Sequence, residues 1–304
     1  MADLTPHLFN ALTLGAIYAL IAVGYSMVYG IVRLINFAHG EVYMAGAMVA
    51  WWLTEQPWWA GGETIPLLLA LPLSMIACAA LGMAIDQVAY RPLRSKPRIV
   101  VLITAIGVSL ALQTTAMLLF GASPKSFRAA SIPAFFGATW FSVGQADILG
   151  KEVAIWVAAA ASMVALDLLV HRTRVGRAMR ACALDQPTAS LMGIDTNAII
   201  ALTFAIGSAL AAVAGVLHAI KLGGNIDARM GYYPGLIAFA AAVLGGIGSI
   251  RGAILGGMVI GVVQALVEGL VSTSHGLTGA FAVMIGVILV RPYGLLGKPE
   301  AKRA

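Results

Sequence analysis

The sequence predicts an all-α protein that crosses a membrane several times. Hydrophobic residues occupy 60% of the 304 positions and charged residues only 11%, with a mean hydropathy of +0.91. A soluble domain carries roughly 25% charged residues, so this chain has too few polar side chains to cover a water-soluble surface. No alternating pattern typical of a membrane β-barrel occurs. Backbone groups in lipid must therefore pair within helices.

The intervals between charged residues locate the membrane helices, because a crossing takes roughly 20 apolar residues. Six intervals are long enough, and they are bounded by residues 3 and 33, 63 and 86, 98 and 125, 195 and 221, 229 and 251, and 268 and 291. Three shorter intervals, at 41–55, 152–167 and 251–268, reach the length of a crossing only if the helix includes a carboxylate near one end. We expect a single transmembrane domain, 1–304, with eight or nine transmembrane helices, including discontinuous or re-entrant segments.

The basic residues predict the orientation of these helices, since Lys and Arg prefer the cytoplasmic side. Most of the 19 Lys and Arg residues fall in clusters near 91–98, 172–180 and 291–303, which share one side when the helices are counted. The C-terminus is then cytoplasmic and the N-terminus lies outside, in a multi-pass membrane protein. We expect residues 121–152 to form an excursion outside the membrane, with a hairpin around Gly137 and Gly144.

Motifs for enzymatic chemistry are missing from the sequence. It contains no Gly-x-x-x-x-Gly-Lys-Ser/Thr phosphate loop, no His-Glu-x-x-His and no Gly-x-Ser-x-Gly. The two cysteines, Cys78 and Cys182, lack metal-site spacing. We therefore expect a chain that is not an enzyme and binds no cofactor or metal. The net charge of +6 is explained by the membrane rather than by nucleic acid.

Two polar or glycine-rich interruptions mark a candidate translocation path. The first, Asn36-Phe-Ala-His-Gly-Glu41, precedes an unusually short apolar run, as expected of a discontinuous helix that lines a pathway. The second, Leu244–Gly252, is rich in glycine between two apolar segments and predicts an embedded break or a tight turn. The candidate path residues are Asn36, His39, Gly40, Glu41, Gly245, Gly246 and Gly248.

The loop at about 172–196 predicts a folded element outside the membrane. Asp185 can cap a short helix that has Pro187 at an early position, and Gly193 can end it. Its small apolar surface comprises Ala189, Leu191, Met192 and Ile194. Two interpretations follow from the residues alone: a docking surface for a cytoplasmic protein, or an interfacial helix that rests on lipid.

Six separated blocks of the sequence carry a family resemblance. They are Leu14–Gly30, Ile35–Met44, Val88–Arg94, Gly176–Ala183, Leu191–Ile194 and Ala241–Ile250. In this order the chain resembles, over essentially its whole length, the LivH-type inner-membrane permeases of bacterial branched-chain amino acid ABC importers.

The resemblance implies partners that composition does not show. Such permeases pair with a second, LivM-like permease, receive substrate from a periplasmic amino-acid-binding protein, and are driven by two cytoplasmic ABC ATPases. ATP would then be used by the partner subunits. The ATPase-coupling residues implied are Arg177, Arg180, Asp185, Ala189, Gly193 and Asp195. Where the general permease signature begins Glu-Ala-Ala, this chain has Arg180-Ala-Cys-Ala183, so contacts of that glutamate do not carry over.

The sequence thus predicts a permease subunit that moves Leu, Ile and Val from a periplasmic binding protein to the cytoplasm. Movement of the cytoplasmic coupling helix would open and close gates at the two interruptions. The alternatives are a urea or short-amide permease of the same family, an ion-coupled secondary transporter, and a membrane scaffold. A secondary transporter normally pairs carboxylates near the midplane. The membrane carboxylates of this chain lie near predicted segment ends: Glu41, Asp86, Asp167 and Glu268.

Overall fold

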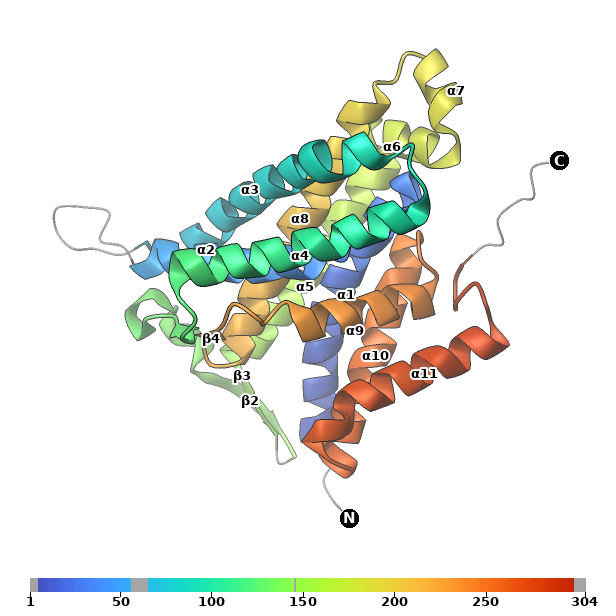
Figure 1. The fold of residues 1–304 in the computed structure, drawn as a ribbon. Coiled ribbons are helices and arrows are strands. Elements are labelled where there is room, and N and C mark those ends of the chain that lie inside the picture. Colours follow the sequence, from blue (N-terminus) through green and yellow to red (C-terminus); the bar gives the residue numbers. More distant parts are fainter. Residues whose placement is uncertain (1–4, 56–64, 145, 298–304) are drawn as a thin grey trace, which may run out of the picture.

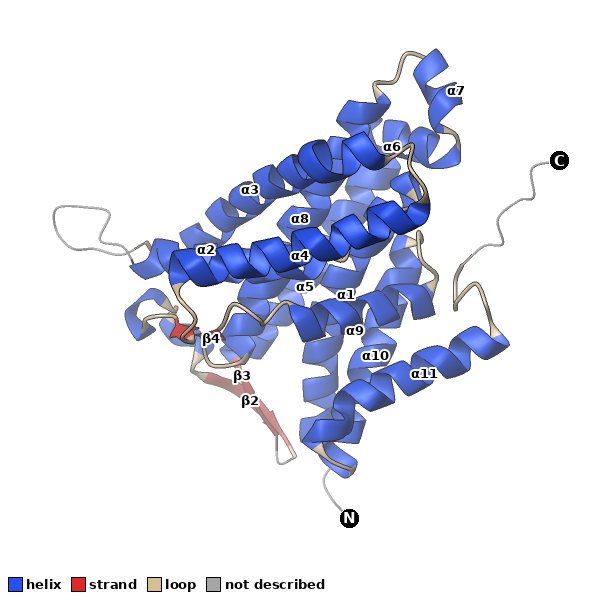
Figure 2. Cartoon of the chain, in the orientation of Figure 1, coloured by secondary structure: helices blue, strands red, loops and turns tan. Residues whose placement is uncertain are grey.

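A computed structural model describes residues 5–55, 65–144 and 146–297. Lys298, Lys302 and Arg303, which contributed to the predicted orientation, lie outside the described residues. Within these ranges the chain is a bundle of helices with two small two-stranded sheets (Figure 2). This arrangement confirms the all-α membrane fold.

Among the described residues, nine apolar helices occupy the six long and three shorter intervals of the sequence. They are α1 (Thr5–Val32), α2 (His39–Glu55), α3 (Leu67–Ile85), α4 (Arg98–Phe120), α5 (Gly150–Arg172), α8 (Thr196–Lys221), α9 (Tyr232–Gly245), α10 (Ile250–Leu270) and α11 (Gly276–Val290). Seven helical segments of the described chain are long and apolar enough to cross a membrane. The other two helices, α2 with 17 residues and α9 with 14, are the discontinuous ones.

The connecting segments separate into two ends of the bundle. One, here called the basic end, carries α6 (Arg174–Leu184), α7 (Gln186–Leu191) and the segments that follow α9 and α11. The other, the hairpin end, carries the start of α1 and four short strands. β1 (Lys125–Ser126) pairs antiparallel with β4 (Asn225–Ile226), and β2 (Thr139–Val143) with β3 (Ala146–Leu149). Figure 1 shows α7 and the N-terminus at opposite ends. The expected hairpin is present, with Gly144 at φ +63°.

α1 forms the centre of the bundle, and Figure 1 shows it passing through the middle. In its most apolar stretch 94% of the residues are buried, against 28% for α3, 17% for α4, 22% for α5 and 11% for the segment that includes α11. The outer helices therefore present apolar side chains outward. In a membrane such a surface meets lipid or another transmembrane subunit.

Glycines set the distance between the central helices. On α10, Gly257 and Gly261 pack on the backbone of α1, at Ala19 and at Gly15. Two further glycines of α10, Gly252 and Gly256, pack on α9 instead. A Cβ atom at any of these positions would overlap main-chain atoms of the neighbouring helix, so the small residues permit direct backbone contact.

Replacement of Gly257 by valine should destabilise the bundle, because the new side chain has no space against Ala19. Overpacking of this kind costs roughly 1–3 kcal/mol or more, which would lower the midpoint of thermal unfolding in detergent. Gly286→Val is the matched control, since a Cβ on Gly286 of α11 meets nothing within 4 Å. Equal midpoints for the two variants would contradict the packing of α10 on α1.

Candidate functional site

The segment between α1 and α2 turns back into the bundle. α1 ends at Val32, and Arg33 adopts φ +57°, which non-glycine residues rarely do. The imidazole of His39 then packs against Gly24, eight residues before the end of α1. At 1.5 Å per residue, α2 begins about 12 Å inside the bundle from the basic end. The discontinuous helix predicted at Asn36–Glu41 is therefore present.

A buried polar network holds this re-entrant segment. The Tyr90 hydroxyl donates to Asn36 Oδ1 at 2.7 Å, and Tyr90 ends the π-helical turn Asp86–Tyr90 that continues α3. Asp86 is buried and pairs with Arg94 at 2.5 Å, and Arg94 also donates to Asn197 of α8 at 2.8 Å. Tyr90 thus fixes the segment to the extension of α3, which Arg94 in turn fixes to α8. Tyr90 was not among the residues predicted from the sequence.

The first turns of α2 and α9 meet inside the bundle. A Cβ on Gly40 would lie 2.6 Å from the Gly231 carbonyl oxygen and 3.1 Å from Gly235 Cα, so only glycines allow this approach. From there α2 extends about 26 Å to the hairpin end and α9 about 21 Å to the basic end. We call the contact between His39–Glu41 and Gly231–Gly235 the junction. Both helices direct their N-termini, which carry positive partial charge, at it.

Glu41 is the acidic side chain of the junction. It is the third residue of α2 and only 3% exposed. The Ser109 hydroxyl of α4 donates to Glu41 Oε1 at 3.2 Å, whereas Oε2 has no hydrogen-bond partner in the described structure. Oε2 lies 3.0 Å from the position that a Cβ on Gly231 would take. The two helix N-termini favour the negative charge here. Ser109 is one of several uncharged polar residues of α4, such as Thr104 and Gln113, so nothing in the sequence singled it out.

His39 faces the opposite side of the same helical turn. Its ring makes an edge contact with Tyr25 of α1 at a centroid distance of 4.8 Å, and Nε2 has no hydrogen-bond partner among the described residues. The sequence grouped His39 with Glu41, but the structure separates their side chains. His39 belongs to the packing of α2 on α1, and Glu41 faces α4 and α9.

The second glycine interruption is a tight turn between α9 and α10. Gly246 and Gly248 have φ of +104° and +93°, and Ser249 caps α10 by accepting from the Gly252 amide at 3.1 Å. The Gly245 carbonyl accepts from the Leu296 amide at 3.0 Å. This turn follows the C-terminus of α9, whereas the junction lies at its N-terminus. The predicted path residues therefore form two groups about 21 Å apart rather than one site.

The predicted coupling loop at 172–196 folds into two helices. Asp185 caps α7 by accepting from the Thr188 amide at 2.9 Å, and Gly193 ends the motif at φ +83°. Asp195 caps α8 by accepting from the Ala198 amide at 3.0 Å. The short helix predicted between Asp185 and Gly193 is present. The preceding helix α6 was not predicted, although Thr173 caps it by accepting from the Gly176 amide at 3.0 Å.

An exposed apolar patch covers these two helices. It consists of Leu184, Leu191 and Met192, which are 78%, 88% and 78% exposed. Ala189, predicted to contribute to this surface, is buried beneath it at 4% exposure. Arg177 is exposed, and Arg180 is half-buried and donates to the Val170 carbonyl. The patch and Arg177 are thus exposed, while Ala189, Asp185, Gly193 and Asp195 shape the motif.

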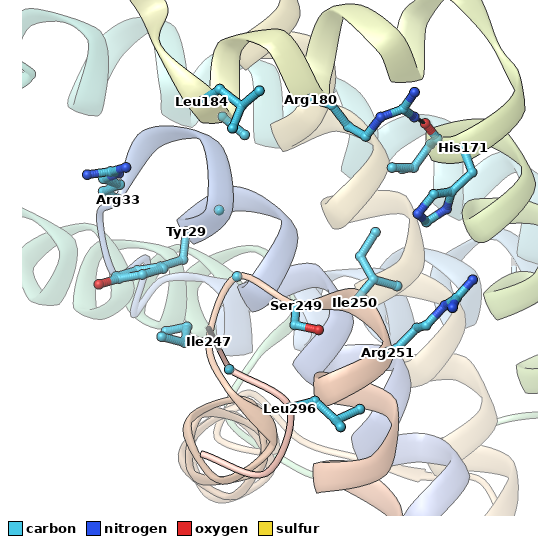
Figure 3. A pocket seen from close by; sticks show the side chains of 15 residues that line it. Tyr29, Arg33, His171, Arg180, Leu184, Ile247, Ser249, Ile250, Arg251 and Leu296 are labelled. Atoms are coloured by element: carbon cyan, nitrogen blue, oxygen red, sulfur yellow. Dashed lines mark hydrogen bonds between the residues drawn. The ribbon is translucent and has the colours of Figure 1, made fainter. Parts of the chain in front are cut away.

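A cavity of about 890 Å³ separates α6 from the turn between α9 and α10. In Figure 3, Tyr29 and Arg33 lie opposite Arg180, His171 and Arg251. Asp167 interacts with both His171 and Arg251 at the rim, at 3.2 and 3.7 Å. Side chains therefore leave open space between α6 and the turn.

Comparison with known proteins agrees with this architecture. Residues 7–290 match the family described as branched-chain amino acid transport system / permease component. The chain is 45% identical to the high-affinity branched-chain amino acid transport system permease protein LivH of Salmonella typhimurium, over 98% of this chain and 96% of that protein.

Two further relatives are similar to it. BraD of Pseudomonas aeruginosa, a high-affinity branched-chain amino acid transport system permease protein, is 44% identical over 98% of this chain and 97% of BraD. The ribose import permease protein RbsC of Escherichia coli is 27% identical over 84% of this chain and 75% of RbsC. The chain therefore belongs to the family of permease components of branched-chain amino acid transport systems.

Proposed function

We propose that the chain is the transmembrane permease subunit of an ATP-driven importer for branched-chain amino acids in a bacterial inner membrane. The observation that carries this proposal is the 44–45% identity, over 98% of the chain, to LivH and BraD. The more distant similarity to a ribose permease indicates that the scaffold serves more than one substrate class. Substrate is therefore assigned from the relatives that match the whole chain.

The distribution of charge supports an orientation for this subunit. The basic end holds Arg33, Arg94, Arg180 and Arg251, and Lys and Arg prefer the cytoplasm. The C-terminus then lies in the cytoplasm and the N-terminus and β2–β3 in the periplasm. A periplasmic amino-acid-binding protein would dock at the hairpin end, and a second, LivM-like permease would cover part of the outer apolar face. No cofactor is required by this chain, because ATP is bound by the partner subunits.

Two ABC ATPases would drive the cycle, one of them through the patch on α6 and α7. Leu184, Leu191 and Met192 are large apolar side chains on an exposed surface at the basic end, which suits burial in a protein groove. Closure of the ATPases would move α6 toward the turn at Gly246–Gly248, across the cavity that separates them. α9 connects that turn to the junction, so the movement would reach Glu41 through one short helix.

Replacement of Leu191 by aspartate should uncouple the permease from its ATPase. A charged side chain in an apolar docking groove loses the burial of Leu191 and leaves an unpaired carboxylate. We expect at least a tenfold loss of ATPase activity stimulated by the loaded binding protein in the purified importer.

Leu222→Asp is the matched control for this variant, because Leu222 is 51% exposed at the hairpin end. It should retain stimulation within about twofold. The docking assignment would be wrong if Leu191→Asp hydrolysed ATP and transported normally.

Cells that lack this chain should lose high-affinity uptake of radiolabelled leucine, and expression of the chain should restore it. ATP depletion should abolish the uptake, whereas a proton uncoupler applied at constant ATP should leave it intact. If deletion left leucine uptake unaffected but abolished uptake of urea or short amides, the chain would be a urea or short-amide permease instead. Uptake that follows the ion gradient would contradict the ATP-driven mechanism.

A further inference from the structure

We propose that Glu41 at the junction binds the ammonium group of the amino acid during its passage. The inference rests on the proposed function and adds a recognition role for one named atom, Glu41 Oε2. Its physical basis is that this carboxylate is buried, is not neutralised by a basic side chain in the described structure, and has one oxygen without a partner.

Comparison with the other buried carboxylate shows why Glu41 is unusual. Asp86 is equally buried, but it pairs with Arg94 at 2.5 Å. No Lys, Arg or His lies within salt-bridge distance of Glu41 among the described residues. Its one recorded side-chain partner is the neutral hydroxyl of Ser109. Asp86 Oδ2 also lacks a hydrogen-bond partner, but Arg94 neutralises that carboxylate. A buried charge is normally paired or coordinated, so the unpaired carboxylate of Glu41 marks a place for a positively charged ligand.

The groups around Glu41 Oε2 select a ligand that donates hydrogen bonds. The carbonyl oxygens of Gly40 and Gly231 line the glycine contact beside it, and each carbonyl oxygen can accept a second hydrogen bond. An ammonium group supplies a positive charge and three N–H donors. Urea offers donors but no charge, so it cannot neutralise the carboxylate.

The junction also makes such binding reversible. The N-termini of α2 and α9 stabilise the carboxylate when no ligand is bound, so Glu41 need not take up a permanent counter-ion. The ammonium group therefore gains less by binding than it would at an unstabilised carboxylate, and it is released readily. A transported substrate requires this moderate affinity, because a site must bind well enough to admit it and weakly enough to let it leave.

The test uses the complete importer in proteoliposomes, with radiolabelled leucine and the loaded binding protein. The measured quantity is leucine moved per ATP hydrolysed, together with the stimulated ATPase rate. Glu41→Gln keeps the shape and removes the charge, Glu41→Asp keeps the charge, and Glu268→Gln is the matched control. Glu268 is a half-buried carboxylate of α10 that accepts from Gln264 at 2.6 Å, away from the junction.

We expect Glu41→Gln to lower leucine moved per ATP at least tenfold while the ATPase rate stays within about twofold. Glu41→Asp should move more leucine per ATP than Glu41→Gln does, and Glu268→Gln should move as much as the unmodified importer. A normal ratio in Glu41→Gln overturns the inference, and so does a parallel loss of transport and hydrolysis, which indicates a structural role. Transport that requires sodium in the unmodified importer also overturns it, because a metal ion would then occupy the carboxylate.

Ser109→Ala provides a second variant in case Glu41→Gln does not assemble. It removes the hydroxyl that orients Glu41 Oε1 and should lower the ratio about threefold to tenfold; an unchanged ratio would overturn the inference. Failure of the proposed function is distinguishable, since the unmodified importer would then move no leucine at all. Leucine transport that does not depend on Glu41 would contradict only the role of this residue.

Discussion

The contact between Gly40 and Gly231 is the constraint on which the rest of the structure depends. Two helix N-termini carry like partial charges and unpaired amide groups, so their approach inside an apolar bundle needs compensation. Glycine removes the steric obstacle, and the Glu41 carboxylate supplies the opposite charge. The short lengths of α2 and α9, the re-entrant segment after Arg33, and the buried Asn36–Tyr90 hydrogen bond all follow from placing these two termini together.

In this arrangement a single helix, α9, links the glycine turn near the proposed docking surface to the junction. α9 is a single short helix whose N-terminus lies at the junction and whose C-terminus enters the glycine turn beside the cavity. Its neighbour α10 contacts it through backbone at glycine positions, so few bulky side chains interlock between these two helices. The central bundle can stay packed while α9 and the turn change position. Such a small displacement at one end suits alternation between states of a transporter.

Sequence reasoning located the apolar intervals of eight or nine helices, because charged residues interrupt them, and the caps at Asp185 and Gly193, because capping is local. It was wrong to take 229–251 as long enough to cross, since α9 in that interval has only 14 residues. It also placed Glu41 at a helix interruption. It could not show that Gly40 meets Gly231, since 191 positions separate them and both lie in ordinary glycine-containing stretches. Ser109 and Tyr90 were missed for the same reason. Ala189 was assigned to the docking surface because periodicity over a helix of six residues is too short to distinguish its faces.

The accessibility of the junction to water is the most direct measure of whether it lines a path. Ser109→Cys, in the assembled importer, should react with a hydrophilic, membrane-impermeant thiol reagent, since a thiol reacts as the thiolate and needs a polar environment. Leu110→Cys, one residue further on α4 and 58% exposed on the outer face, should react far more slowly, and the native Cys78 and Cys182 are buried. We predict that Ser109→Cys is labelled faster than Leu110→Cys. Leucine and the loaded binding protein should slow the labelling of Ser109→Cys. Labelling of Ser109→Cys no faster than that of Leu110→Cys would contradict a polar path at the junction.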